Sequence, residues 1–171
     1  MAALLAVSLA NAWMFRGDFR AAAGALFVRR DPQAENWERW ARHYDRLFAM
    51  LASGERIGIQ VEGHQASGYL LERTGGTMRG RSALLIRRQH PGVVLTIQQA
   101  AATEMLSSLD HDPDSIWQEM KDRLSAREIS LGCDNDVSRL QRGGYLAFMR
   151  AIDTRPPGMK WPAVKALLGE K

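Results

Sequence analysis

The sequence holds few of the residues that mark disulfide-rich or disordered proteins. Its 171 residues include one cysteine, Cys133, so no intramolecular disulfide can form and a disulfide scaffold is excluded. No low-complexity tract is present, and a hydrophobic fraction of 46% excludes a disordered chain. This length and composition predict a single domain, residues 1–171, and the lone cysteine fits the reducing cytoplasm.

Lysine is also scarce. The chain has 19 arginines but four lysines, and its net charge is +4. The planar fork of an arginine side chain suits phosphate and carboxylate groups, so one interpretation is a surface that binds anions. The alternative is the codon usage of a GC-rich genome, which raises the arginine content without any function.

No hydrophobic run is long enough to cross a membrane. The most apolar stretch, residues 1–12, is short, and charged residues from Arg16 onward interrupt its extension. It also lacks the early positive charge of a secretory signal. Residues 1–30 are therefore predicted to form an apolar helical segment packed on the domain or on a partner protein. A membrane anchor formed by residues 1–28 and a cleaved signal are the alternatives.

Short runs rich in Val, Ile, Leu and Tyr occupy residues 56–99, and each is bounded by Gly or Pro. Such runs are typical of strands joined by turns. On both sides of them the apolar residues recur every three or four positions, as in helices. We therefore predict an α+β fold, in which a four-stranded, mainly antiparallel meander packs against helices from the N-terminal and C-terminal parts. Its strands are expected at residues 57–61, 68–73, 83–86 and 93–97.

The clearest predicted helix begins at Asp31-Pro32, where Asp serves as the cap and Pro occupies the first turn. It ends at Ser53-Gly54. Its apolar residues fall on one face, which is typical of a helix packed on a core. The alternative is a platform that stacks nucleic-acid bases on its aromatic side chains. The stripe consists of Trp37, Trp40, Tyr44, Leu47, Phe48 and Leu51.

The C-terminal half predicts further helices. One covers residues 100–109, and a second starts after Asp112-Pro113, which again combines a cap with a proline. A third starts at Asn135 or Asp136, and Gly143-Gly144 predicts a kink or a break inside it.

Two local clusters could support chemistry. Residues 110–114 place three carboxylates at alternate positions, as a calcium loop does, but Ser115 and Lys121 stand where that loop needs Gly and Glu. Cys133 would need a general base to act as a nucleophile, and its neighbour Asp134 disfavours the thiolate. We therefore predict no metal site and no cofactor.

The best functional signal is a basic, glycine-rich stretch, residues 74–81, between two predicted strands. Arginines lie within it and on both sides of it, so in a meander they would gather near one edge of the sheet and hold an anionic backbone. The simpler interpretation is a solvated hairpin whose arginines protect an edge strand. The candidate binding residues are Arg73, Arg79, Arg81, Arg87 and Arg88.

Together these patterns favour a non-catalytic binding or accessory module, a subunit of a larger assembly. Its partner would be a protein, a nucleic acid or both, held by the basic glycine-rich stretch. One alternative is a small hydrolase that uses Cys133 or carboxylates. The other is a membrane-associated component anchored by residues 1–28. No motif in the sequence specifies a reaction.

Overall fold

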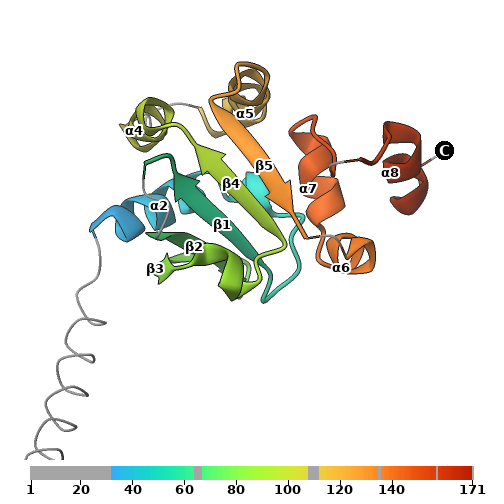
Figure 1. The fold of residues 1–171 in the computed structure, drawn as a ribbon, viewed down its shortest axis with the longest axis horizontal. Helices are drawn as coiled ribbons and strands as arrows, with labels where there is room; N and C mark the ends of the chain where they lie inside the picture. The colour runs from blue at the N-terminus through green and yellow to red at the C-terminus, as the bar shows by residue number, and fades with distance from the viewer. Residues whose placement is uncertain (1–31, 64–66, 108–111, 135, 157, 171) are drawn as a thin grey trace, which may run out of the picture. The chain divides into compact units, whose positions relative to one another are not determined.

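The computed structural model describes residues 32–63, 67–107, 112–134, 136–156 and 158–170, which belong to one compact unit. The predicted segment at residues 1–30 lies outside the described residues, as do Asp110 and His111. Helices and strands alternate in blocks along the unit (Figure 1). In chain order they are α2 (Pro32–His43), α3 (Asp45–Phe48), β1 (Arg56–Val61), β2 (Ser67–Thr74), β3 (Thr77–Leu84), the 3-10 helix η1 (Ile86–Gln89), β4 (Val93–Ile97), α4 (Gln99–Ser107), η2 (Pro113–Ser115), α5 (Ile116–Ser125), β5 (Ile129–Cys133), α6 (Val137–Arg142), α7 (Tyr145–Ala151) and α8 (Trp161–Leu167).

The strands form one mixed sheet in the order β3-β2-β1-β4-β5. The predicted α+β class is confirmed, but the four-stranded antiparallel meander is wrong in two respects. β4 runs parallel to β1, and β5 adds a fifth strand antiparallel to β4. A parallel neighbour requires a crossover between strands instead of a hairpin, and residues 85–92 supply it between β3 and β4.

The glycine-rich stretch is mostly strand. β3 begins at Thr77, so the predicted strand at residues 83–86 is placed too late and the loop is only the two-residue turn Gly75-Gly76. Both glycines have positive φ angles, 59° and 86°, which tight hairpin turns require. Arg79 and Arg81 are therefore held on an edge strand in fixed register with β2.

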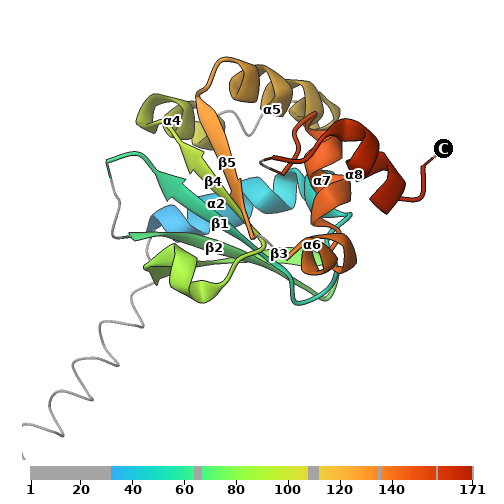
Figure 2. The same ribbon diagram turned by 45° about the vertical axis from the view of Figure 1, so that its right-hand side comes forward.

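Helices cover one face of the sheet, and the main core lies between them and the strands (Figures 1 and 2). The aromatic stripe of α2 and α3 is buried there, so the prediction that it forms core is confirmed and the stacking platform is wrong. Trp40 is 1% exposed and makes edge contacts with Trp37 and Tyr44, with centroids 5.6 and 5.5 Å apart. Burying side chains of this size supplies roughly 1.5–3 kcal/mol each.

The helices of the C-terminal half begin and end near the predicted signals. Asp136 caps α6, since its carboxylate accepts the backbone N–H of Arg139 at 3.1 Å. The glycine pair separates α6 from α7, and Gly144 has a φ of 78°. A β-carbon at Gly144 would meet the carbonyl oxygen of Met50 at 1.8 Å, so only glycine fits this crossing.

The outer edge of β3 is covered by side chains of α2. The N–H of Gly80 points away from β2 and donates to Oε2 of Glu38 at 3.0 Å. The carbonyl of Met78 accepts a long bond, 3.5 Å, from Nε of Arg42. Glu38 and Arg42 also form an ion pair with each other along α2. This pair occupies backbone groups that would otherwise be open to another strand.

Candidate anion-binding surface

The second face of the sheet, here called the open face, is crossed by residues 85–92, here called the strap. The strap lies in front of the strands in Figure 1. Its anchor is Ile86, which is 4% exposed and packs in a small second core. The other members of that core are Leu70, Ala83 and Val94.

Two glycines let the strap lie flat on the sheet. A β-carbon on Gly58 would meet Cγ2 of Ile86 at 2.5 Å, and one on Gly68 would meet its Cγ1 at 2.8 Å. Both distances are shorter than carbon atoms tolerate, so a larger residue at either position would lift Ile86 from its seat. The path of the strap is thus encoded in β1 and β2 as much as in the strap itself.

The strap is held in an unusual backbone conformation at both ends. Leu85 and His90, which flank η1, have φ angles of 51° and 49°. Such left-handed angles are uncommon in residues other than glycine, and a leucine there has a conformational cost. Side chains fix the far end: Nη2 of Arg139 donates to the carbonyl of His90 at 2.7 Å, and Nη2 of Arg81 donates to Oε1 of Gln89 at 3.3 Å. A strained segment held in this way is a candidate for function.

A hollow lies on each side of the strap. The larger, about 690 Å³, is floored by Gln60 and Thr96 and bordered by the arginines of η1, with Glu62 as its acidic residue. The smaller, about 260 Å³, includes Arg87, His90 and Gly132. Arg87 lines both hollows.

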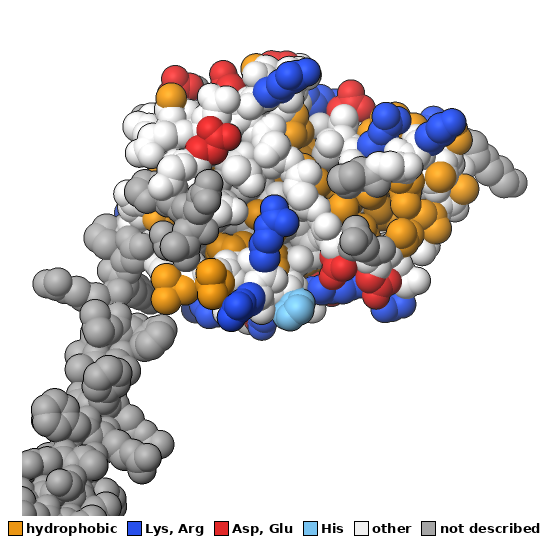
Figure 3. Space-filling model, in the orientation of Figure 1, with side chains coloured by type: hydrophobic (Ala, Val, Ile, Leu, Met, Phe, Trp, Pro, Cys, Tyr) orange, Lys and Arg blue, Asp and Glu red, His pale blue; other side chains and the backbone are white. Residues whose placement is uncertain are grey.

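The predicted arginines fall into two groups. Arg87 and Arg88 are exposed on η1, and Arg79 and Arg81 are exposed on the strap side of β3. Arg73 does not join them, since its Nη1 donates to the carbonyl of Phe48 at 2.5 Å on the helix-covered side. In Figure 3 basic side chains and exposed hydrophobic ones stand together at the strap end of the open face. Leu84, the last residue of β3, and Leu85, the first residue of the strap, are 68% and 49% exposed.

Sequence reasoning missed the residues between the arginines. Nε of Arg56 lies 2.8 Å from Oε2 of Glu72, and Glu72 stands opposite Arg79 across the β2–β3 pair. A row of alternating charge therefore crosses three strands, and Glu72 offsets part of the charge of Arg79. Side chains alternate between the two faces of a strand, so Arg56 and Gln60 lie on the same face of β1. This alternation in the sequence could have identified both residues as part of the surface.

The hydrolase alternative depends on Cys133. Cys133 and His90 both border the smaller hollow, but the Cys133 side chain packs against the main core. It makes no hydrogen bond to either described histidine, His43 or His90. Burial, followed by the charge of Asp134, raises the pKa of the thiol. Because a nucleophilic cysteine needs a lowered pKa and a base, this arrangement disfavours thiol chemistry.

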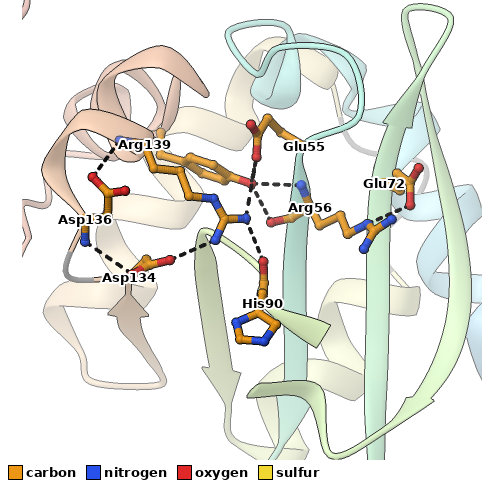
Figure 4. Close-up of polar contacts among 8 residues, drawn as sticks. Glu55, Arg56, Glu72, His90, Asp134, Asp136 and Arg139 are labelled. Carbon is orange, nitrogen blue, oxygen red and sulfur yellow. Dashed lines mark hydrogen bonds and ion pairs between the residues drawn. The ribbon is translucent and has the colours of Figure 1, made fainter. Parts of the chain in front are cut away.

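A partly buried polar network at the start of β1 is structural. The hydroxyl of Tyr145 lies 2.8 Å from Oε2 of Glu55, accepts the N–H of Arg56 at 2.8 Å and lies 2.8 Å from its carbonyl oxygen. Figure 4 shows Glu55 and Arg56 meeting there, with Arg139 and Asp134 beside them. Burial, followed by the bond to Glu55, raises the pKa of Tyr145 well above its usual range. The neutral hydroxyl of Tyr145 therefore links α7 to the start of β1, and this contact is here called the Tyr145 tie.

No protein-family model matches the chain, and no curated protein matches its sequence. In the part of the chain that the structure describes, no group of three His, Cys, Asp or Glu side chains could hold a metal ion. Within the same residues, every helix is too short or too polar to span a lipid bilayer.

Proposed function

We propose that the protein is a non-catalytic accessory module whose open face binds an acidic segment of a partner protein. The observation that carries this proposal is the strap. It presents Arg87 and Arg88, which have no ion pair with any described residue, beside the exposed Leu84 and Leu85. Carboxylates suit the arginine forks, and the exposed leucines offer apolar contact that a bare phosphate backbone would leave unused.

A nucleic acid is the weaker candidate for the same surface. Single strands are bound by aromatic side chains on which bases stack. Here the aromatic residues of α2, α5 and α7 pack in or against the main core, on the opposite face of the sheet.

The proposal is tested by fluorescence anisotropy with a labelled peptide of alternating glutamate and leucine. Arg87→Ala combined with Arg88→Ala is expected to weaken binding at least about tenfold, because each lost charged hydrogen bond contributes roughly 1.5–3 kcal/mol. The matched control is Arg39→Ala with Arg142→Ala, which removes the same charge from exposed sites on α2 and α6 and should leave binding unchanged.

A labelled oligonucleotide, single-stranded and duplex, is titrated in parallel. Preferential binding to the oligonucleotide would reassign the surface to nucleic acid. On duplex DNA the log affinity should then fall linearly with the log of the salt concentration, with a slope of about −0.9 per phosphate contact. If neither probe binds at low salt, or if the control pair weakens binding as much as the strap pair, the open face is not a binding surface for anions.

A further inference from the structure

The outward edge of β5 can be assigned from the bonding of its neighbours. The N–H of Asp134 donates to the carbonyl of Gly92 at 2.9 Å, and the N–H of Gln98 donates to the carbonyl of Glu128 at 2.9 Å. Bonded pairs recur at every second residue of an antiparallel ladder, so the even-numbered residues of β5 bond to β4. The N–H and C=O groups of Ile129, Leu131 and Cys133 therefore point away from the sheet.

These groups have no partner among the described residues. No side chain or backbone group from the rest of the described chain bonds to them, and β5 itself contains no charge, no proline and no bulge. Natural sheets rarely leave an edge of this kind without protection. The opposite edge, at β3, has Glu38 and Arg42 in place for that purpose.

The surroundings of β5 also suit burial by another molecule. Leu131 and Cys133 are half-buried residues at the rim of the main core, together with Leu167 and Leu168. In Figure 3 hydrophobic side chains gather over the side of the unit that carries α7 and α8. A strand added to β5 would therefore gain apolar contacts as well as backbone hydrogen bonds.

We propose that β5 pairs antiparallel with β5 of a second copy of this chain, about a two-fold axis at Leu131. In this register Leu131 faces Leu131 of the second copy, and Ile129 faces its Cys133. All three outward residues of each copy then meet outward residues of the other, so the edge is complementary to itself, as a closed two-fold contact requires. The two sheets join into one continuous sheet.

The charges at the two ends of β5 permit this pairing. Glu128 of one copy comes opposite Asp134 of the other, which would repel if both were unpaired. Each carboxylate has an arginine of its own chain nearby. Nη1 of Arg139 lies 2.8 Å from Asp134, and Nη1 of Arg123 lies 2.9 Å from Glu128, although Arg123 also pairs with Glu104 and Glu119. The arginines therefore weaken the repulsion at both ends of the uncharged strand without cancelling it.

Disulfide formation tests the register in the 171-residue chain. Leu131→Cys in a Cys133→Ser background places two thiols on the axis, where α-carbons in a bonded pair are about 5.5 Å apart, within the disulfide range of roughly 4.4–6.8 Å. Mild oxidation should give a covalent dimer. The matched control is Ser130→Cys in the same background, since residues 130 of the two copies would be about 8 Å apart and cannot be bridged.

Sedimentation velocity of the protein that keeps Cys133 and carries no introduced cysteine tests the assembly itself. The wild type should be a dimer, and Leu131→Pro should raise the dimer dissociation constant at least about tenfold, because proline removes the two central donors. The N–H of Leu131 is not part of the β4–β5 ladder, so circular dichroism and thermal melting should show that the variant folds. A monomeric wild type, or crosslinking at Ser130→Cys equal to that at Leu131→Cys, would overturn the proposal.

Discussion

The two edges of the sheet end in opposite ways. At β3, α2 lies close enough for Glu38 to accept the N–H of Gly80 and for Arg42 to reach the carbonyl of Met78. At β5, the outward groups of Ile129, Leu131 and Cys133 meet no such side chain among the described residues. One edge is closed by the chain's own helix, and the other has no such cover among the described residues.

The difference shows what closes an edge in this protein. A larger residue at position 80 would be crowded, because its β-carbon would lie 3.0 Å from the carbonyl oxygen of Ala34 in α2. The close approach of α2 in turn depends on the aromatic core beneath it. Closure of β3 is therefore a product of packing, and four changes to the sequence test the contrast with β5.

Loss of the packing under α2 should have the largest effect. Trp40→Ala is expected to lower the free energy of unfolding by about 3–5 kcal/mol, because it leaves a large cavity in the main core. Urea denaturation measures the change, with Arg39→Ala on the exposed side of α2 as the control. A loss below about 1 kcal/mol would contradict the assignment of this residue to the core.

Pushing α2 away from β3 should have the next largest effect. Gly80→Val places a branched side chain against Ala34 and Glu38 and is expected to cost roughly 1–3 kcal/mol despite the better strand propensity of valine. Arg79→Val, on the other face of the same strand, should leave stability nearly unchanged. Thermal unfolding of both variants compares them, and equal losses would show that α2 does not need the glycine.

Removing the covering side chains should open β3 with little loss of stability. Glu38→Ala with Arg42→Ala is expected to cost about 1 kcal/mol, since the freed backbone groups gain water. The double variant is made in a Leu131→Pro background, in which pairing through β5 is blocked, and it should then self-associate through β3. Sedimentation velocity detects this gain. A strictly monomeric triple variant would show that the ion pair does not protect the edge.

The thiol of Cys133 should give the smallest effect. Its pKa is raised by burial and by Asp134, so the reactive thiolate forms only at a higher pH than in free cysteine. Alkylation near neutral pH should be slower than that of free cysteine, and slower still at protein concentrations where β5 pairs. Leu84→Cys in a Cys133→Ser background, at an exposed site of β3, should react at nearly the rate of free cysteine. Faster alkylation of Cys133 than of free cysteine would instead revive the nucleophile.

Local patterns in the sequence predicted the parts of the fold that depend on neighbouring residues. The helical spacing from Trp37 onward identified the core face of α2, and the glycine pair before Tyr145 located the break between α6 and α7. The helix caps at Asp112 and Asp136 were also predictable from the sequence, and both side chains accept backbone N–H groups at the expected positions.

The errors arose where distant residues decide the outcome. The glycines of residues 74–81 predict a loop because glycine is a poor strand former, whereas α2 and β2 hold β3 in place. The parallel pairing of β1 and β4 depends on the seat of Ile86 between Gly58 and Gly68, which no local pattern reveals. β5 was overlooked although Ile129 and Leu131 alternate with a polar residue, because five residues give a weak signal.

The candidate surface was predictable only in part. Charge along the chain located Arg79, Arg81, Arg87 and Arg88, but the direction of each side chain depends on the strand boundaries. Because β3 starts at Thr77, Arg79 and Arg81 share the open face, while Arg73 is bound to Phe48 on the other side. Arg87 and Arg88 are both exposed because they belong to a 3-10 helix and not to a strand.

The Tyr145 tie also bears on synthesis of the chain. Its hydroxyl bonds to the backbone of Arg56 across a separation of 89 residues. All five strands are complete at Cys133, so the residues of the whole sheet emerge from the ribosome before Tyr145, which fixes the start of β1. During that interval the main core lacks α7, including the stacked ring of Phe148 on Phe48. The nascent chain therefore exposes its β5 edge and an unfinished core together until α7 emerges, and exposed surface of this kind favours aggregation.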